Sequence, residues 1–266
     1  MSTLERFRVL HTKGIFLMPN VWDVGSARLL EHLGFPAIAT TSSGHAGSLG
    51  RFDQQVGRDE LLAHAEALAA AVSVPVSVDS EACFPGEPGG VARTLQLIAR
   101  TGAAGCSIED YDPASGVLPV ELAVDRVREA AAVAADHGLV LTARAENLLY
   151  GITDLDDTIA RLIAYRDAGA DVLYAPGLTE PAAIERVVRQ VAAAVNVLAV
   201  PGIPPTRELE RAGVRRVSTG GSLAWVAYGA LAAAARELRD TGTTTYLAAA
   251  LGQADQDAAF AERPPG

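Results

Sequence analysis

Short apolar runs of strand length alternate with helix-patterned segments along most of the chain. The apolar runs are bounded by glycine, proline or polar residues and lie at 15–19, 37–41, 76–80, 105–110, 139–146, 171–176, 195–201 and 216–220. Segments with helical periodicity separate them, near 23–33, 59–72, 89–101, 119–136, 154–168, 180–193, 205–212 and 222–239. Strands that alternate with helices in this way predict a parallel sheet.

Eight strand–helix units in one chain predict an α/β fold of the TIM type, a closed (β/α)8 barrel. An open doubly wound sheet is the alternative, but the turn after the first run, PNVWDVGSA, lacks a strong dinucleotide-binding fingerprint. We expect residues 1–243 to form the barrel and residues 244–266 to add a C-terminal helix and a flexible tail.

Composition narrows the class of protein. A chain of 266 residues that is 49% hydrophobic can build one sizeable core. The net charge of −10 argues against nucleic acid or an anionic membrane as a partner. The longest apolar stretch, LAWVAYGALAAAA, is too short to span a bilayer. The polar N-terminus is unlike a signal peptide, and two cysteines, Cys83 and Cys106, fit a reducing compartment, so we expect a cytoplasmic protein.

Acidic side chains end three of the predicted strands, in VSVDSEA, CSIEDYD and LTARAEN. Because side chains alternate along a strand, the pairs Ser77–Asp79, Ser107–Glu109 and Thr142–Arg144 are each expected to face the barrel lumen. The acids Asp79, Glu81 and Glu109 then converge at the top of the lumen, where active sites of such barrels lie. An all-oxygen cluster suits Mg²⁺ or Mn²⁺.

Two alternatives concern the positively charged residues. The acids could pair with Arg144 and serve only the fold, although one arginine cannot neutralise so many strand-end carboxylates. The sequence argues against Schiff-base chemistry, because the single lysine, Lys13, precedes the first apolar run.

At these residues the chain resembles the isocitrate lyase and phosphoenolpyruvate mutase superfamily. The resemblance runs from about residue 14 to 245 and depends on the order and spacing of PNVWDVGSARL, TTSSGHAGSLGRFD, VSVDSEACF, CSIED, TARAE, VNVLAVPG and RRVSTGGSLA. It implies a (β/α)8 barrel that binds Mg²⁺ and a small 2-oxo or 2-hydroxy acid. It also implies a homotetramer, a dimer of dimers whose subunits exchange a C-terminal helix.

The resemblance also implies roles for individual residues. Asp79, Glu81 and Glu109 match the metal-binding acids, and Asp53 matches an acid that acts through water. The substrate-binding positions correspond to Trp22, Asp23, Ser43, Gly44, His45 and Arg144, with the segment 43–45 holding a carboxylate through backbone N–H groups.

The chain departs from the family pattern at the acid–base group. Family lyases carry Lys-x-Cys-Gly-His on the loop after the fourth strand and mutases carry a lysine and an asparagine, whereas residues 111–121 read YDPASGVLPVE. The remaining catalytic candidates are Arg144, Tyr111 and His45. Cys83 replaces a glycine of the pattern and is more simply a core residue.

These observations predict a Mg²⁺-dependent carbon–carbon lyase or decarboxylase that acts on a small 2-oxo or 2-hydroxy acid through an enolate. One alternative is a phosphoenolpyruvate mutase or another enzyme of the phosphonate C–P bond, against which the missing loop lysine and asparagine count. A second alternative is a degenerate barrel that binds an acid metabolite without turnover.

Overall fold

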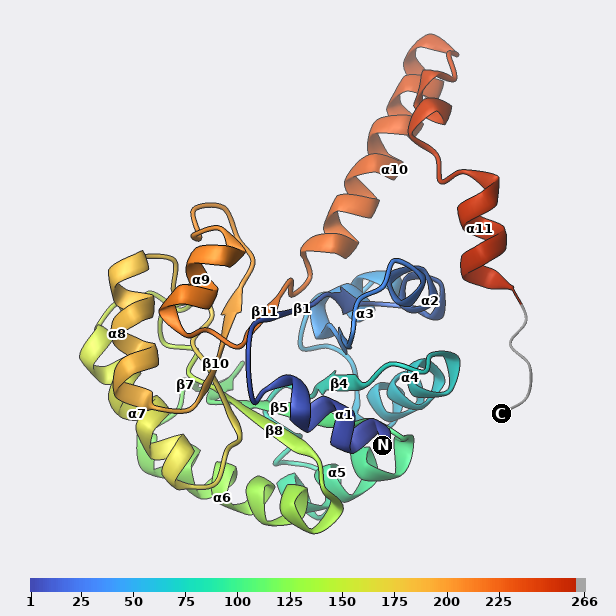
Figure 1. Cartoon of the computed structure of the whole chain (residues 1–266). Coiled ribbons are helices and arrows are strands. Elements are labelled where there is room, and N and C mark those ends of the chain that lie inside the picture. The colour runs from blue at the N-terminus through green and yellow to red at the C-terminus, as the bar shows by residue number, and fades with distance from the viewer. Residues whose placement is uncertain (262–266) are drawn as a thin grey trace.

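The computed structural model describes residues 1–261 and confirms the predicted barrel. Nine parallel strands form one sheet in the order β1-β11-β10-β9-β8-β5-β4-β3-β2, and helices surround it (Figure 1). The strands are β1 (Phe16–Met18), β2 (Asn20–Val21), β3 (Ile38–Thr40), β4 (Val76–Asp79), β5 (Gly105–Glu109), β8 (Val140–Arg144), β9 (Val172–Tyr174), β10 (Ala194–Leu198) and β11 (Arg216–Ser218).

The first strand of the barrel is broken into two pieces at Pro19. Proline has no backbone N–H to give to a neighbouring strand, so the pairing changes sides at this residue. β1 pairs with β11, whereas β2 pairs with β3, and the Pro19 carbonyl accepts a hydrogen bond from the Ala39 N–H at 3.0 Å. The two pieces together bring the ends of the sheet close to closure.

The helices predicted between the strands are present within two residues of their expected limits. They are α2 (Val24–His32), α4 (Arg58–Ala71), α5 (Gly90–Ile98) with η1 (Ala99–Thr101), α6 (Val120–His137), α7 (Leu155–Asp167), α8 (Pro181–Val191), α9 (Thr206–Ala212) and α10 (Ser222–Thr241). The side chains facing them alternate as predicted, since Val78, Cys106, Ile108, Leu141 and Ala143 all lie in the main hydrophobic core.

Three elements were not predicted by the hydrophobic pattern. They are α1 (Thr3–Leu10), α3 (Ser42–Ser48) and a small antiparallel hairpin of β6 (Tyr111–Asp112) and β7 (Gly116–Val117). α1 closes the lower end of the barrel, where Phe7 packs with Phe16, Val140 and Val172 in a second apolar cluster. The upper end stays open above the strand ends.

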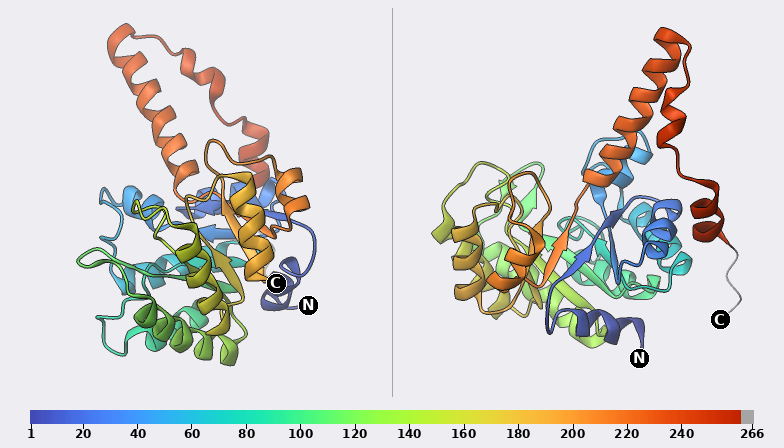
Figure 2. Two further views of the ribbon diagram at one scale, coloured as in Figure 1. Left: turned by 90° about the vertical axis from the view of Figure 1, so that its left-hand side faces the viewer. Right: turned by 45° about the horizontal axis from the view of Figure 1, so that its top comes forward.

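The C-terminal part of the chain extends away from the barrel (Figure 1). α10 projects away from the barrel from Ser222 onward, and α11 (Gln253–Phe260) returns to contact α2 of the same chain (Figures 1 and 2). η2 (Thr245–Ala249) connects the two helices. The predicted flexible end of the tail, residues 262–266, lies outside the described residues. Within residues 1–261, no helix has both the length and the apolar character needed to cross a membrane.

Candidate active site

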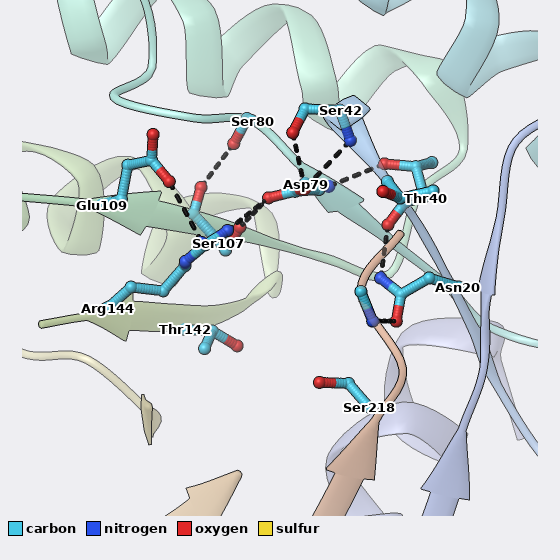
Figure 3. Close-up of polar contacts among 12 residues, drawn as sticks. Asn20, Thr40, Ser42, Asp79, Ser80, Ser107, Glu109, Thr142, Arg144 and Ser218 are labelled. Carbon is cyan, nitrogen blue, oxygen red and sulfur yellow. Dashed lines mark hydrogen bonds and ion pairs between the residues drawn. The ribbon is translucent and has the colours of Figure 1, made fainter. Parts of the chain in front are cut away.

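A cavity of about 190 Å³ opens at the carboxyl ends of the strands, as predicted for a barrel of this type. Asp79, Ser107, Glu109 and Arg144 meet beside it, and their side chains come from three adjacent strands (Figure 3). The volume is below the roughly 300–1,000 Å³ of pockets that bind drug-sized ligands. The cavity therefore suits a small molecule.

Asp79, at the end of β4, is held by four hydrogen-bond donors. Its Oδ2 accepts from the Ser42 N–H at 3.0 Å and from the Ser42 hydroxyl at 3.1 Å. Its Oδ1 accepts from the Ser107 hydroxyl at 3.2 Å and from Arg144 Nη1 at 2.8 Å. These contacts hold the carboxylate in one orientation at the wall of the cavity.

Arg144, at the end of β8, contacts three carboxylates. Nη1 lies 2.8 Å from Asp79 Oδ1, Nη2 lies 3.2 Å from Glu109 Oε2, and Nε lies 2.7 Å from Glu146 Oε1. The guanidinium also lies 5.4 Å from the centre of the Tyr174 ring. Three of its five N–H groups are used in this way, which leaves two for another ligand.

Glu81 lies in a turn with unusual backbone angles. Its φ is +51°, and two further non-glycine residues follow in the left-handed region, Cys83 at +57° and Phe84 at +49°. Such angles each cost about 1–3 kcal/mol and are frequent at functional sites. The Glu81 side chain is buried, and within the described residues its Oε1 has no hydrogen-bond partner. Burial, with repulsion from Asp79 and then Glu109, raises the pKa of Glu81 to about 8.

Glu109 and Asp53 complete the acidic group. Glu109 accepts a hydrogen bond from Gln54 Nε2 at 2.7 Å, and burial raises the pKa of its carboxyl despite the opposing charge of Arg144. Asp53 lines the cavity, and burial raises its pKa also. All four predicted metal-binding acids thus lie close enough to influence one another, because Asp79, Glu109 and Asp53 each raise the pKa of Glu81.

These acids are not arranged as a finished metal site. Within residues 1–261, no three histidine, cysteine or acidic side chains form a group that could hold a metal ion, and Arg144 lies between Asp79 and Glu109. The donor set nevertheless fits a hard divalent cation, because it offers only oxygen atoms. The unpartnered Glu81 oxygen supports the fit, since a buried carboxylate oxygen without a partner is costly.

The segment 43–45, predicted to bind a carboxylate, forms the first turn of α3, which begins after the N-cap residue Thr41. Two of its N–H groups are used within the protein, since Gly44 donates to the Thr41 hydroxyl at 3.2 Å and His45 to the Thr41 carbonyl at 3.0 Å. Ser43 lines the cavity. The His45 ring stacks on His64 at 3.7 Å instead of lining the cavity.

Trp22, Asp23 and Tyr111 do not line the cavity. Asp23 is the N-cap of α2, where its Oδ1 accepts a hydrogen bond from the Ser26 N–H at 2.6 Å. Tyr111 begins the hairpin that replaces the family loop, and its ring stacks on Tyr150 at 3.8 Å.

Cys83 is a core residue in the structure. It is fully buried, its Sγ lies 3.6 Å from the Ser107 carbonyl, and burial raises the pKa of the thiol to about 12. Its left-handed φ also explains why the family pattern has a glycine at this position.

Several cavity residues were missed by the sequence reasoning. They are Asn20, Ser42, Tyr174, Asn196 and Arg216. The alternation that places Asp79 in the lumen also places Asn196 and Arg216 there, so strand parity was the available signal. Asn20 links two elements, because its Oδ1 accepts from the N–H groups of Thr219 and Gly220, each at 2.9 Å.

Comparisons with known proteins agree with this geometry. The family model described as phosphoenolpyruvate phosphomutase matches residues 7–239. An uncharacterised protein of Mycobacterium tuberculosis is 35% identical over 221 residues, covering 80% of this chain and 81% of that protein. The 2-methylisocitrate lyase of Escherichia coli is 34% identical, covering 66% and 60%. The oxaloacetate decarboxylase of Bradyrhizobium diazoefficiens is 31% identical, covering 70% and 67%.

Solved structures show the same fold. A candidate lyase/mutase of Burkholderia cenocepacia is 48% identical, with a TM-score of 0.93 over 98% of this chain and 96% of that one. An oxaloacetate acetylhydrolase in complex with its product oxalate is 25% identical, with a TM-score of 0.86 over 97% and 94% of the two chains.

Proposed function

Because the chain belongs to the phosphoenolpyruvate phosphomutase family, within the isocitrate lyase/phosphoenolpyruvate mutase superfamily, we propose that it is a Mg²⁺-dependent lyase or decarboxylase. Its substrate would be a small 2-oxo or 2-hydroxy acid, and bond cleavage would pass through an enolate. Relatives named for methylisocitrate and oxaloacetate chemistry support a small carboxylic acid as the substrate class. The structural neighbour that binds oxalate supports it also.

The observation that carries this proposal is the buried Glu81 carboxylate. Its Oε1 has no partner within the described residues, and its nearest charged neighbours include Asp79 and Glu109. Repulsion between such acids is costly unless a proton or a cation lies among them. A turn of three left-handed residues holds Glu81 in place, which is more than a surface acid would require.

Asp79, Glu81 and Glu109 would hold the ion, and Asp53 would act on it through water. Bound there, Mg²⁺ would supply Lewis-acid stabilisation of the negative charge that develops on the substrate oxygens. Ser42 and Ser107 would keep the Asp79 carboxylate oriented, through the hydrogen bonds they already donate to it. Orientation by such neighbours typically affects metal affinity or activity by about 10- to 100-fold.

Arg144 would bind the substrate carboxylate with its two remaining N–H groups. Glu146 fixes the guanidinium through the 2.7 Å contact at Nε, so the Nη atoms stay directed toward Asp79 and Glu109. Ser43 and the two glycines that follow β11, Gly220 and Gly221, also line the cavity. The hairpin offers no lysine, cysteine, histidine or asparagine, so a cavity water is the proton source we favour.

Metal binding tests the proposal directly. Titration of the protein with Mn²⁺, followed by electron paramagnetic resonance, should show one site per chain, and Asp79→Ala should abolish it. Asp125→Ala is a matched control, because Asp125 lies on the exposed face of α6 and pairs only with Arg128 in the described residues. Unchanged Mn²⁺ affinity in Asp79→Ala would remove the central element of the proposal.

Turnover is tested with a panel of small 2-oxo and 2-hydroxy acids, with and without Mg²⁺. We expect Mg²⁺-dependent release of a shorter 2-oxo acid, detected by its reduction with an added dehydrogenase. Metal binding without turnover of any member of the panel would favour the degenerate-barrel alternative.

A further inference from the structure

Within residues 1–261, two cationic side chains line the cavity, Arg144 and Arg216. Arg144 already contacts three carboxylates. Arg216, on β11, has a different environment, because no carboxylate of the described residues forms an ion pair with it and only 3% of its surface is exposed. A buried cation without a counter-ion is costly, so its presence needs a reason.

Neutral acceptors hold Arg216 across the lumen. Nε donates to Asn196 Oδ1 at 2.9 Å, Nη2 donates to the Thr142 hydroxyl at 3.0 Å, and Nη1 lies 3.3 Å from His11 Nε2. Thr142 is on β8, which is not adjacent to β11 in the sheet, so the guanidinium spans the inside of the barrel. It lies between the cavity and the apolar cluster that α1 closes from below.

Within the described residues, no carboxylate forms an ion pair that would compensate the positive charge of Arg216. Burial lowers the pKa of Arg216 to about 10, which leaves it protonated at neutral pH. Burial, with the charge of Arg216, lowers the pKa of His11 to about 3, so His11 is neutral. Its Nδ1–H donates to the Phe7 carbonyl at 2.8 Å, which leaves Nε2 as the acceptor that faces Arg216. The carboxylates that line the cavity are Asp53 and Asp79, and Asp79 ends its strand. Arg216 instead contacts Thr142, two residues before the end of β8.

The cavity wall between the strand-end carboxylates and Arg216 is polar. Ser77, Ser107, Thr142 and Ser218 place hydroxyl groups around the lumen, where barrels of this type usually carry bulky branched side chains. Thr142 lies two residues before Arg144 on the same strand, so its layer is about 7 Å deeper. The carboxylate carbons of an extended four-carbon diacid lie closer together than this, and only its outermost oxygens approach this separation.

We propose that Arg216 forms the floor of the substrate cavity and selects dicarboxylic acids by binding the carboxylate remote from the Asp79–Glu81–Glu109 group. This inference rests on the proposed function, and it restricts the substrate to short diacids such as oxaloacetate. A dianion would otherwise be repelled by a protein with a net charge of −10 and an acidic cavity mouth. Arg216 supplies the compensating charge, and the Thr142 hydroxyl, which accepts a hydrogen bond from Arg216, has an O–H to donate to the same carboxylate.

The test measures ligand affinity of the Mn²⁺-loaded protein by isothermal titration calorimetry. The probes are oxalate, pyruvate and 3,3-difluorooxaloacetate, a diacid that resists cleavage. The wild type should bind the diacid at least about tenfold more tightly than pyruvate, as expected for a charge-assisted contact. In Arg216→Gln this preference should fall to about twofold or less, while oxalate affinity stays within about twofold, and Arg216→Lys should retain part of the preference.

A comparison that needs no variant covers the case in which Arg216→Gln fails to fold. The wild type should bind the distal monoamide of oxaloacetate at least about tenfold more weakly than the diacid. Equal affinity for the two, or an undiminished diacid preference in folded Arg216→Gln, would overturn the inference while leaving the proposed function intact. Failure of the Mn²⁺-loaded wild type to bind oxalate would overturn the proposed function, and the inference with it.

Discussion

The residues to which we assign a role in this protein are buried charged residues with unusual surroundings. Arg144 is surrounded by carboxylates, Glu81 has an oxygen without a partner, and Arg216 has neutral neighbours only. Each arrangement is unfavourable or incomplete by itself. Arg144 and Arg216 line one cavity, and Glu81 lies close enough to its lining residue Asp79 for the two charges to interact. Natural proteins accept such local costs mainly where they bind or transform something.

The buried His11 leads to a prediction about how the stability of the fold depends on pH. Its pKa in the folded protein is about 3, against 6.5 for the free side chain, so the unfolded chain takes up the proton first as the pH falls. The stability contribution is therefore present above pH 6.5 and is lost as the pH falls toward 3. Between about pH 7 and 5 the loss is up to about 2 kcal/mol.

Urea unfolding at both pH values and one fixed protein concentration measures this loss. His11→Gln, which keeps an acceptor for Arg216 but does not titrate, should lose less stability than the wild type over the same interval. His32→Gln, at the exposed end of α2, is the control and should behave as the wild type does. An acid sensitivity that His11→Gln leaves unchanged would contradict the prediction.

The close packing around Gly105 leads to a prediction about the cost of adding a side chain there. A Cβ at this position would lie 2.5 Å from the Val140 carbonyl oxygen and 2.7 Å from the Phe7 ring, where β5, β8 and α1 meet. Neither atom belongs to a flexible side-chain end, so Gly105→Ala should lower the free energy of unfolding by about 1–3 kcal/mol. Gly86→Ala, where no atom lies within 4 Å of the added carbon, should stay close to the wild type in the same denaturation experiment.

At the scale of elements, the hairpin after β5 sets the limits of the site. Its turn is closed by Asp112, whose Oδ1 accepts from the N–H groups of Ala114 and Ser115 at 2.9 and 3.0 Å. Arg161 donates to the Leu118 carbonyl at 2.9 Å and so holds the far end of the hairpin to α7. The element is therefore short and fixed at both ends, which differs from a long loop that folds over a large substrate.

This hairpin predicts negligible activity on isocitrate and methylisocitrate. It carries no group to manage the proton at the nascent carbanion, and general acid–base help is worth about 10² to 10⁴ in rate. Assays for glyoxylate and pyruvate release should therefore give rates at least about 100-fold below the order of 10 s⁻¹ usual for dedicated enzymes. Oxaloacetate, assayed in the same preparation, is the positive control. Turnover of isocitrate near 10 s⁻¹ would show that another group replaces the loop.

At the scale of the whole molecule, α10 extends from the barrel as an arm with little of its own chain around it (Figure 2). Its exposed side chains include Trp225, Val226, Leu231 and Leu238, each more than half exposed. Trp225 also donates from Nε1 to the Ser43 hydroxyl at 3.1 Å, so the base of the arm touches the cavity wall. Apolar surface of this kind usually marks a protein–protein contact.

We therefore predict a homotetramer built from dimers that exchange this arm, starting at residue 222 instead of after residue 243. Light scattering should give about four times the chain mass of 27.6 kDa. Leu231→Asp on the arm should shift the protein toward smaller species, whereas Leu122→Asp, an exposed leucine on α6, should not. A wild-type mass near 28 kDa would contradict the prediction.

The sequence alone determined the fold class and the end of the barrel at which the candidate site lies. All eight predicted strand runs overlap a strand of the barrel, because short apolar runs between helical segments are typical of the buried strands of a parallel sheet. Strand alternation likewise placed Ser77, Ser107, Thr142 and Arg144 around one cavity. These features follow from local periodicity, which the chain order records directly.

Only the tertiary structure decided which groups touch. No strong hydrophobic periodicity marks the polar helices α1 and α3 or the short hairpin. Their packing became visible only in three dimensions. The pairing of Arg144 with three acids, the stacking of His45 away from the cavity and the span of Arg216 from β11 to β8 all join residues far apart in the chain. Such contacts depend on closure of the barrel, and closure brings together side chains that no local pattern relates.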